Sequence, residues 1–422
     1  MYSSTNLHPV IRVVDKMFVV VAVLFLMNVA TYFLVGNIQA DVGYFVEQDN
    51  PFARLSWYPL YGMTILLALV YVVPVLKSLL YNPLIYLLLA ITIASIVYSV
   101  EPEVTLRRVL ALTMTVMIGI YFGVRPDWMQ TLRLIGIGCA IFCLMQLVLI
   151  AGLSSTAIHQ DVNAGAWRGM FAEKNALGAS AAVSGLIFSM LAHLNRGTRW
   201  LWMFMVMIAV FLVIGSRSAT ALISFVIPVA LYLLVVFTND APRTRLIVLY
   251  FGSLVAFVPV YLIVFEPELI LGIFGKDVTL TGRTDIWNMT WSAIRERPWT
   301  GYGYAAFWQK ELGPSYIIST QLEWTVPSAH NAWIEQGLHA GLPGVIGLAV
   351  LAGSVFLKSL IVIVKSEVAI PFVIVLQLVI FSLSESAALW WHNTFTCVLF
   401  VFASILAFRP LPRSRKQGQP RW

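Results

Sequence analysis

Four short segments of the sequence contain residues whose side chains could bind a phosphate group and transfer what is attached to it. They are Arg168 and Lys174 in 167–178, Arg217 in 214–220, Arg283 in 280–287, and His330 in 328–333. Arginine forms bidentate hydrogen bonds to phosphate oxygens and keeps its charge at any physiological pH. Two or three arginines could hold a lipid-linked diphosphate and neutralise the charge that develops as it leaves. A histidine, with an ordinary pKa of about 6.5, could take a proton from an attacking hydroxyl.

Each of these residues also has a purely structural interpretation. Arg217 at a helix end could reach toward the membrane surface, and Arg283 could pair with Asp285 or Glu296. His330 beside Asn331 could mark the start of a helix. Glu385, near the outer end of an apolar segment, is a weaker candidate. No DxD-type acidic pair argues for a metal-dependent transfer, so we expect neither a metal ion nor a cofactor.

The composition determines which elements can position these residues. Hydrophobic residues make up 59% of the 422, charged residues 11%, and the mean hydropathy is +0.84. A soluble chain would carry about a quarter charged residues. The sequence therefore predicts an all-α polytopic membrane protein.

Apolar segments of the length needed to cross a bilayer recur along the chain and predict about twelve transmembrane helices. They fall near 17–36, 58–77, 80–99, 109–124, 134–152, 175–193, 200–215, 218–237, 246–265, 342–364, 368–387 and 393–408. Lys and Arg concentrate in alternate connections, which predicts that both termini are cytoplasmic. The basic tail 409–422 then serves as a topology anchor rather than a nucleic-acid-binding segment.

The connections predict four regions. Residues 1–265 hold nine spans with short loops, 266–341 form one large external loop, 342–408 hold three spans, and 409–422 are the tail. A loop this long usually has a function. Within it, the amphipathic stretch 285–297 suits a helix at the membrane surface. The candidate residues all fall on the external side.

At these residues the sequence resembles the O-antigen ligase and polymerase superfamily, membrane glycosyltransferases that use undecaprenyl-diphosphate-linked saccharides. The likeness rests on four stretches in the family's order. They are FAEKNALG at 171–178, GSRSA at 215–219, TGRTDIW at 281–287, and His330-Asn331 followed by Gly337 and GLPG at 341–344. It is strongest over 165–345, whereas the N-terminal third matches only in hydropathy.

The resemblance implies roles for individual residues. Arg217 and Arg283 would bind the donor's diphosphate, and His330 would activate the acceptor hydroxyl, giving inverting, metal-independent transfer. A substrate-binding group would surround them: Arg168, Lys174, Asn175, Asp285, Trp287 and Asn331. Glu173 departs from the family pattern, in which a histidine is common at this position.

The motifs leave the subtype open. A polymerase transfers a growing chain to a carrier-linked repeat, whereas a ligase transfers a finished chain to lipid A–core. The KNALG stretch at 174–178 favours an exopolysaccharide polymerase. Protein O-glycosylation, a lipid-linked oligosaccharide flippase and a non-catalytic assembly partner remain alternatives. We expect an inner-membrane protein whose partners are the lipid-linked donor, a saccharide or lipid A–core acceptor, membrane lipids, and chain-length or export proteins.

Overall fold

A computed structural model describes residues 8–35, 51–160, 163–237, 281–308, 313–366, 369–386 and 388–408. Over these ranges the chain is helical, with one isolated bridge between Ile158 and Trp167 and no strand. The ninth expected span, 246–265, and the basic tail 409–422 lie outside the described residues. The all-α membrane fold expected from the hydropathy is confirmed.

The helices of the first half are α1 (Pro9–Leu26), α2 (Val29–Val35), α4 (Pro51–Ser56), α5 (Tyr58–Val70), α6 (Val72–Tyr81), α7 (Pro83–Ala94), α8 (Pro102–Val124), α9 (Trp128–Gly152), α10 (Ser154–Ala157) and α11 (Lys174–Leu194). Those of the second half are α12 (Arg199–Gly215), α13 (Ala219–Phe237), α16 (Thr281–Glu296), α17 (Pro314–Gln321), α18 (Ala332–Ser366), α19 (Ile370–Ser382) and α20 (Thr394–Phe408).

Seven of the described helical segments are long and apolar enough to cross a membrane, or eight if α6 and α7 form one bent span. The bend between α6 and α7 is 86°. It falls at Asn82, because Pro83 has no N–H to continue the helix and disfavours a helical conformation in the residue before it. The count of twelve spans stays a prediction.

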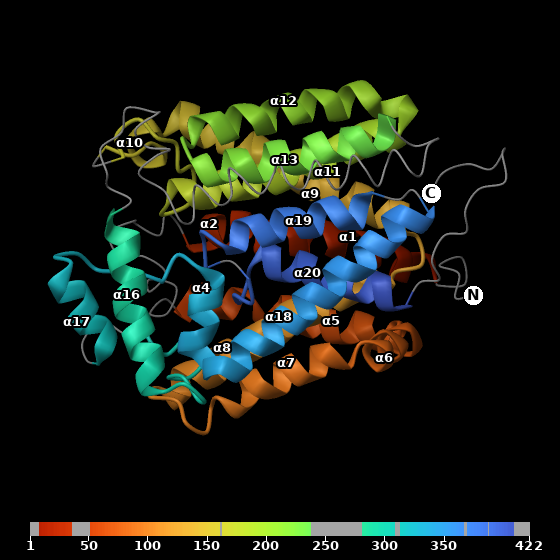
Figure 1. Cartoon of the computed structure of the whole chain (residues 1–422). Coiled ribbons are helices and arrows are strands. Elements are labelled where there is room, and N and C mark those ends of the chain that lie inside the picture. Colours follow the sequence, from red (N-terminus) through yellow and green to blue (C-terminus); the bar gives the residue numbers. More distant parts are fainter. Residues whose placement is uncertain are drawn as a thin grey trace.

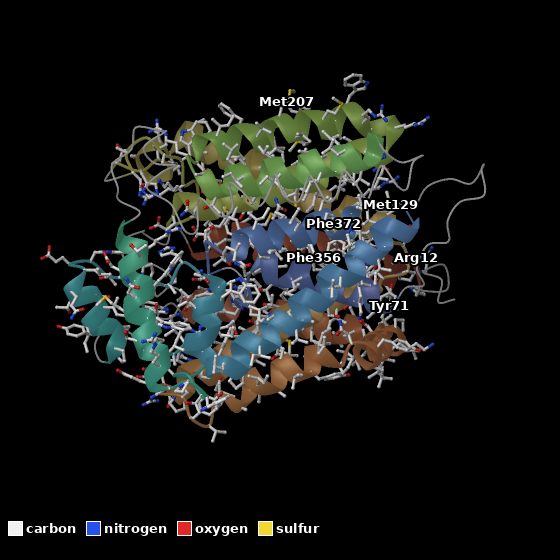
Figure 2. The ribbon with its side chains drawn as sticks, viewed as in Figure 1. Arg12, Tyr71, Met129, Met207, Phe356 and Phe372 are labelled. Carbon is white, nitrogen blue, oxygen red and sulfur yellow. The ribbon has the colours of Figure 1, made fainter. Side chains whose placement is uncertain are left out.

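The surface of the bundle is apolar, as expected for contact with lipid. Met207 points outward from α12 and is 62% exposed, and Trp200 on the same helix is 78% exposed (Figure 2). Between the helices, aromatic side chains fill the interior: Phe356 of α18 and Phe372 of α19 have ring centroids 5.4 Å apart. Apolar side chains on both faces of a helix indicate a membrane environment rather than water.

The two ends of the bundle differ. At one end, the first turns of α1 meet the end of α8, where Asp15 forms a buried ion pair with Arg125 and accepts a hydrogen bond from Tyr121. At the other end, α16 and α17 lie across the ends of the long helices (Figure 1). The candidate residues gather at this second end.

The expected amphipathic helix is α16, and its apolar face packs on protein. Ile286, Ala293 and Ile294 are buried in a small second core with residues of the 302–338 segment, including Tyr302 and Leu338. Contact with α18 therefore explains the apolar stripe of α16, and it fixes the helix across the end of the bundle.

Helix α18 is kinked at Ala340 and Gly341, the point where the sequence predicted a loop to become a span. Pro343 has no N–H for the carbonyl of His339, and Gly303 N–H donates to that carbonyl instead, at 3.1 Å. Leu342 N–H donates to Pro298 at 2.7 Å, and Tyr302 N–H donates to Leu338 at 2.7 Å. At the kink, backbone N–H and carbonyl groups of α18 lack partners within the helix, and they form hydrogen bonds to the segment 298–303 instead.

Candidate active site

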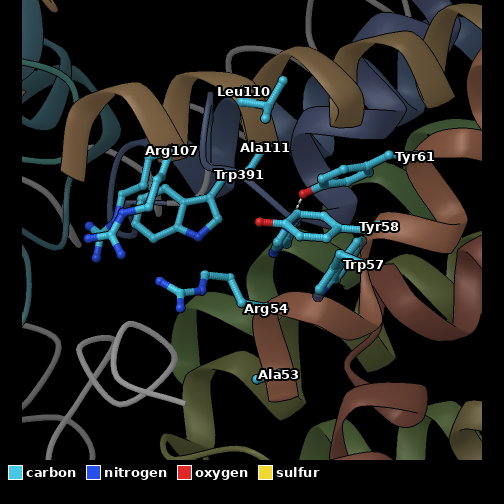
Figure 3. A pocket seen from close by; sticks show the side chains of 11 residues that line it. Ala53, Arg54, Trp57, Tyr58, Tyr61, Arg107, Leu110, Ala111 and Trp391 are labelled. Carbon is cyan, nitrogen blue, oxygen red and sulfur yellow. Dashed lines mark hydrogen bonds between the residues drawn. The ribbon is translucent and has the colours of Figure 1, made fainter. Parts of the chain in front are cut away.

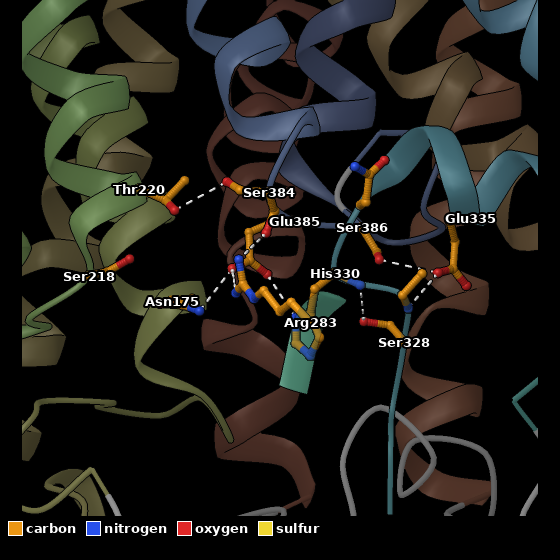
Figure 4. A network of polar contacts seen from close by, with 12 residues as sticks. Asn175, Ser218, Thr220, Arg283, Ser328, His330, Glu335, Ser384, Glu385 and Ser386 are labelled. Carbon is orange, nitrogen blue, oxygen red and sulfur yellow. Dashed lines mark hydrogen bonds and ion pairs between the residues drawn. The ribbon is translucent and has the colours of Figure 1, made fainter. Parts of the chain in front are cut away.

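Glu385 lies at the centre of a polar network that joins three of the sequence motifs (Figure 4). Its Oε1 accepts hydrogen bonds from Arg283 Nη2 at 2.9 Å and from Asn175 Nδ2 at 2.8 Å. Its Oε2 lies 3.3 Å from His330 Nδ1. The side chains are largely withdrawn from solvent, with 8% of Glu385, 15% of His330 and 20% of Arg283 exposed. The network is therefore an ion pair extended by one histidine and one amide.

Arg283, in the first turn of α16, also donates from Nη1 to the carbonyl of Ser384 at 2.9 Å. Its guanidinium thus forms hydrogen bonds to two adjacent residues, Ser384 and Glu385, in the turn after α19. The sequence suggested Asp285 or Glu296 as the ion-pair partner of Arg283, but the structure pairs Arg283 with Glu385. Asp285 is exposed, and Glu296 accepts a hydrogen bond from Tyr302.

His330 is held by its own backbone and by its neighbours. Its φ is +50°, a conformation that non-glycine residues rarely adopt and that clusters at functional sites. Trp287 Nε1 donates to the carbonyl of Ala329 at 2.8 Å, immediately before the histidine. Asn331 Oδ1 accepts from the N–H groups of Trp333 and Ile334 and so caps α18, while its Nδ2 donates to Leu383.

Behind His330, a second carboxylate, Glu335, fixes the same loop. It accepts hydrogen bonds from the N–H of Ala329 at 2.9 Å and from Trp308 Nε1 at 2.7 Å. Ser386 Oγ donates to it from the turn after α19, at 3.2 Å. Glu335 thus ties the histidine loop to the turn that carries Glu385.

Arg217 lies between α12 and α13 with φ +52°, and its side chain is exposed. Its Nη1 donates to the carbonyl of Ala164 at 3.1 Å, which leaves other guanidinium donors accessible. Three residues further, Thr220 accepts a hydrogen bond from Ser384 Oγ at 3.1 Å. This bond links the Arg217 segment to the residue that Arg283 also contacts.

The 171–178 motif lies at the start of α11, packed against the 215–219 motif. A Cβ on Gly178 would lie 2.6 Å from Ser216 Oγ, so only glycine permits this approach. Lys174 Nζ donates to Asn163 at 2.6 Å, whereas Arg168 Nε donates to the carbonyl of Thr156 at 2.9 Å. The hydrogen bond from this region to Glu385 comes from Asn175.

A cavity with an empty volume of about 1290 Å³ opens beside the network. Glu173, Asn175 and Glu385 form part of its polar wall, and Phe381 and Phe395 are among its apolar residues. Arg283 and His330 contact Glu385 at the edge of this cavity without lining it. A polar wall against an apolar one suits a ligand with a charged head and a hydrocarbon chain.

The charge of Glu385 follows from its neighbours. Burial would raise the pKa of this carboxyl, but Arg283 and the hydrogen bond with His330 outweigh burial and hold the pKa below its ordinary value. Glu385 is therefore a carboxylate at neutral pH. As a hydrogen-bond acceptor, it favours the histidine tautomer with the proton on Nδ1, which leaves Nε2 able to accept a proton.

The structure thus brings together Asn175, Arg283, His330 and Asn331. Arg217 itself contacts Ala164, and its segment joins the network through Thr220 and Ser384, while Asp285 is exposed. Among the described residues, no group of three or more His, Cys, Asp or Glu side chains could hold a metal ion. The assigned roles of these residues stay predictions. The sequence pointed only weakly to Glu385, through its place at the end of an apolar segment.

Comparison with known proteins agrees with the motifs. Residues 204–349 match the O-antigen ligase family, a stretch that includes Arg217, Arg283 and His330. Over 229 residues the chain is 30% identical to the exopolysaccharide production protein ExoQ of Rhizobium meliloti (strain 1021). The aligned region covers 51% of this chain and 52% of the relative. The chain thus aligns with about half the length of that relative. The resemblance to the O-antigen ligase and polymerase superfamily is confirmed.

Proposed function

We propose that this multi-pass membrane protein, which resembles the O-antigen ligase and polymerase superfamily, is a glycosyltransferase. It would move a saccharide chain from undecaprenyl diphosphate to an acceptor hydroxyl at the periplasmic face of the inner membrane, with both of its termini cytoplasmic. The observation that carries the proposal is the contact of one carboxylate, Glu385, with both a guanidinium and an imidazole.

In this mechanism Arg283 and Arg217 bind the donor's diphosphate. Arg283 then shares its donors between Glu385, Ser384 and phosphate oxygens, while the exposed Arg217 approaches from the α12–α13 turn. The start of α11, where Glu173 and Asn175 line the cavity, adds the positive end of a helix dipole. The apolar wall accommodates the polyprenyl chain.

The transfer step is a direct displacement that needs no metal ion. The acceptor oxygen attacks the anomeric carbon, and the bond from that carbon to the diphosphate oxygen breaks. The electron pair leaves with undecaprenyl diphosphate, where the arginines stabilise it. The hydroxyl proton passes to Nε2 of His330, and Glu385 stabilises the imidazolium through Nδ1. One displacement inverts the anomeric configuration.

Polymerisation is the activity that we favour. The relative's printed name concerns exopolysaccharide production, and the 174–178 motif points the same way. Ligation to lipid A–core is the second candidate, because the matched family is described as O-antigen ligase. A flippase or other transporter is less consistent with a site whose charged groups lie at helix ends and in turns, since coupling usually needs ionisable groups deep in the membrane.

The size of the saccharide that accumulates on the carrier tests the proposal. The gene is deleted, and the strain is complemented with the wild type, His330→Ala or the control His8→Ala, whose residue precedes α1 at the opposite end of the bundle. Single repeats on undecaprenyl diphosphate, cleared by the wild type and the control but not by His330→Ala, support a polymerase. Long carrier-linked chains, with none on lipid A–core, support the ligase. An unchanged pool in the deletion strain refutes both.

A further inference from the structure

A second cavity shares Trp57, Trp391 and His392 with the cavity described above, and Figure 3 shows the side chains that line it. Its other walls come from α4, α5 and α8, and its empty volume is about 730 Å³. Nothing in the donor-binding roles described above uses this cavity.

Three arginines line the second cavity: Arg54 on α4, and Arg107 and Arg108 on α8. Arg107 is exposed and Arg54 is half-buried, so both guanidiniums can meet a ligand from solvent. Arg108 is 8% exposed and fixed, since its Nη1 donates to the carbonyl of Ala305 at 3.0 Å and its guanidinium lies 4.2 Å from the ring centre of Trp391. Among the described residues, no aspartate or glutamate lines this cavity. Clustered guanidiniums suit a phosphate or diphosphate, which accepts several charge-assisted hydrogen bonds at once.

Aromatic side chains complete the walls. Trp57 stacks on His392 with ring centroids 3.5 Å apart and planes 3° from parallel, and Tyr58 is half exposed. Trp57 is buried, so it is the exposed ring of Tyr58 that offers a flat face to the apolar side of a sugar ring. A ligand that carries both a phosphate and a saccharide fits this combination better than a simple phospholipid does.

His392, one of the three residues that line both cavities, is held firmly. His392 has φ +52°, its N–H donates to Thr115 Oγ1 at 3.0 Å, and its ring is hydrogen-bonded to Tyr61. Because both cavities are lined by Trp57, Trp391 and His392, a phosphate in the second cavity would lie beside the cavity with Glu385.

We propose that this arginine cavity binds the phosphate group of a second glycolipid, the acceptor, so that donor and acceptor are held in adjacent cavities that share Trp57, Trp391 and His392. The proposal rests on the proposed transfer function and deepens it by assigning the acceptor's position. A saccharide linked to a polyprenyl diphosphate and lipid A–core both carry phosphate, and the test below distinguishes them.

Binding stoichiometry tests the site without relying on activity. Native mass spectrometry of the full-length protein in detergent, titrated with farnesyl diphosphate, should detect two bound lipids for the wild type. Arg54→Gln/Arg107→Gln should retain one, as should Arg217→Gln/Arg283→Gln. The control Arg12→Gln/Arg196→Gln, at the opposite end of the bundle, should bind two. Detection of two bound farnesyl diphosphate molecules in Arg54→Gln/Arg107→Gln overturns the proposal. Arg108 is left intact because it packs inside the protein.

Kinetics separate this inference from the proposed function. With purified donor and acceptor, Arg54→Gln/Arg107→Gln should raise the acceptor KM at least tenfold and leave the donor KM within twofold. A rise in the donor KM instead overturns the inference, as does unchanged kinetics. Absence of transfer by the wild type refutes the proposed function, while the two-lipid stoichiometry would still establish the second site.

Competition identifies the ligand. Displacement of one farnesyl diphosphate by a polyprenyl-diphosphate saccharide but not by lipid A–core supports the site and polymerisation. The reverse supports the site and ligation. Equal displacement by phosphatidylglycerol would mean that the cavity binds any anionic headgroup, which overturns an acceptor-specific site.

Discussion

His330 and Glu385 are 55 residues apart in the sequence, yet Nδ1 of the histidine lies 3.3 Å from Oε2 of the glutamate. One residue precedes α18 and the other follows α19, so two helix ends meet at this contact. The carboxylate can orient the imidazole and stabilise its charged form, as the acidic member of a catalytic triad does.

Glu385→Gln should lower kcat by roughly 10²-fold, because an amide neither fixes the same tautomer nor stabilises the imidazolium. The pKa of Glu385 is lowered, so its contribution is complete at neutral pH and is lost only as pH falls through a value below 4.5. An acid limb of the rate profile above pH 5 should therefore belong to another group and persist in Glu385→Gln. Transfer rates measured from pH 4 to 9 check this.

The matched control for that experiment is Glu323→Gln, at an exposed position beyond α17. It should retain the wild-type rate and profile. If the acid limb vanished in Glu385→Gln but not in Glu323→Gln, Glu385 would be the titrating group. The proposal that Glu385 stays ionised and supports His330 would then be wrong.

Arg283→Lys should reduce kcat/KM for the donor by about tenfold to a hundredfold. The guanidinium donates to Ser384 and Glu385 from two nitrogens, each at 2.9 Å, and an ammonium cannot hold both and also bridge a diphosphate. Donor titrations with purified enzyme measure the effect. Arg295→Lys on the exposed side of the same helix serves as control, and near-normal kinetics of Arg283→Lys would remove Arg283 from the donor site.

The chemistry of the site could be anticipated only where it followed from residue type and motif. Arg283 and His330 stand in short polar motifs, so the sequence could single them out. Glu385 stands alone after an apolar segment, and its importance depends on a contact with Arg283 across 102 residues. No local pattern encodes such a distant pairing. The side-chain partners of Arg168 and Lys174 were likewise decided by tertiary packing.

The fold was predictable to the extent that hydropathy reports burial in lipid. It located the apolar helices of the described chain, but not their breaks. The expected span 58–77 is divided at Tyr71 between α5 and α6. Likewise, the amphipathic period of α16 predicted a helix, yet periodicity could not tell whether lipid or protein covers its apolar face.

Trp287→Phe should lower kcat by about fivefold and leave the donor KM unchanged. The indole Nε1 holds the carbonyl of Ala329 beside His330, and such a hydrogen bond contributes about 1 kcal/mol. Phenylalanine keeps the aromatic face, so a purely sugar-stacking role predicts no loss with Phe but a raised KM with Leu. Steady-state kinetics of both variants decide between positioning and stacking, with Trp291→Phe, an exposed position on the same helix, as control.

Gly341→Ala should destabilise the protein by about 1–3 kcal/mol, because it places a side chain at φ +62° in the kink of α18. An added Cβ would lie 2.5 Å from the carbonyl oxygen of Pro298, in the backbone segment that the kink holds. Thermal unfolding in detergent measures the loss. Gly353→Ala is the matched control, since it lies on the same helix in open space and should be neutral or slightly stabilising. Equal unfolding temperatures for the two variants would show that the kink is not held by this close approach.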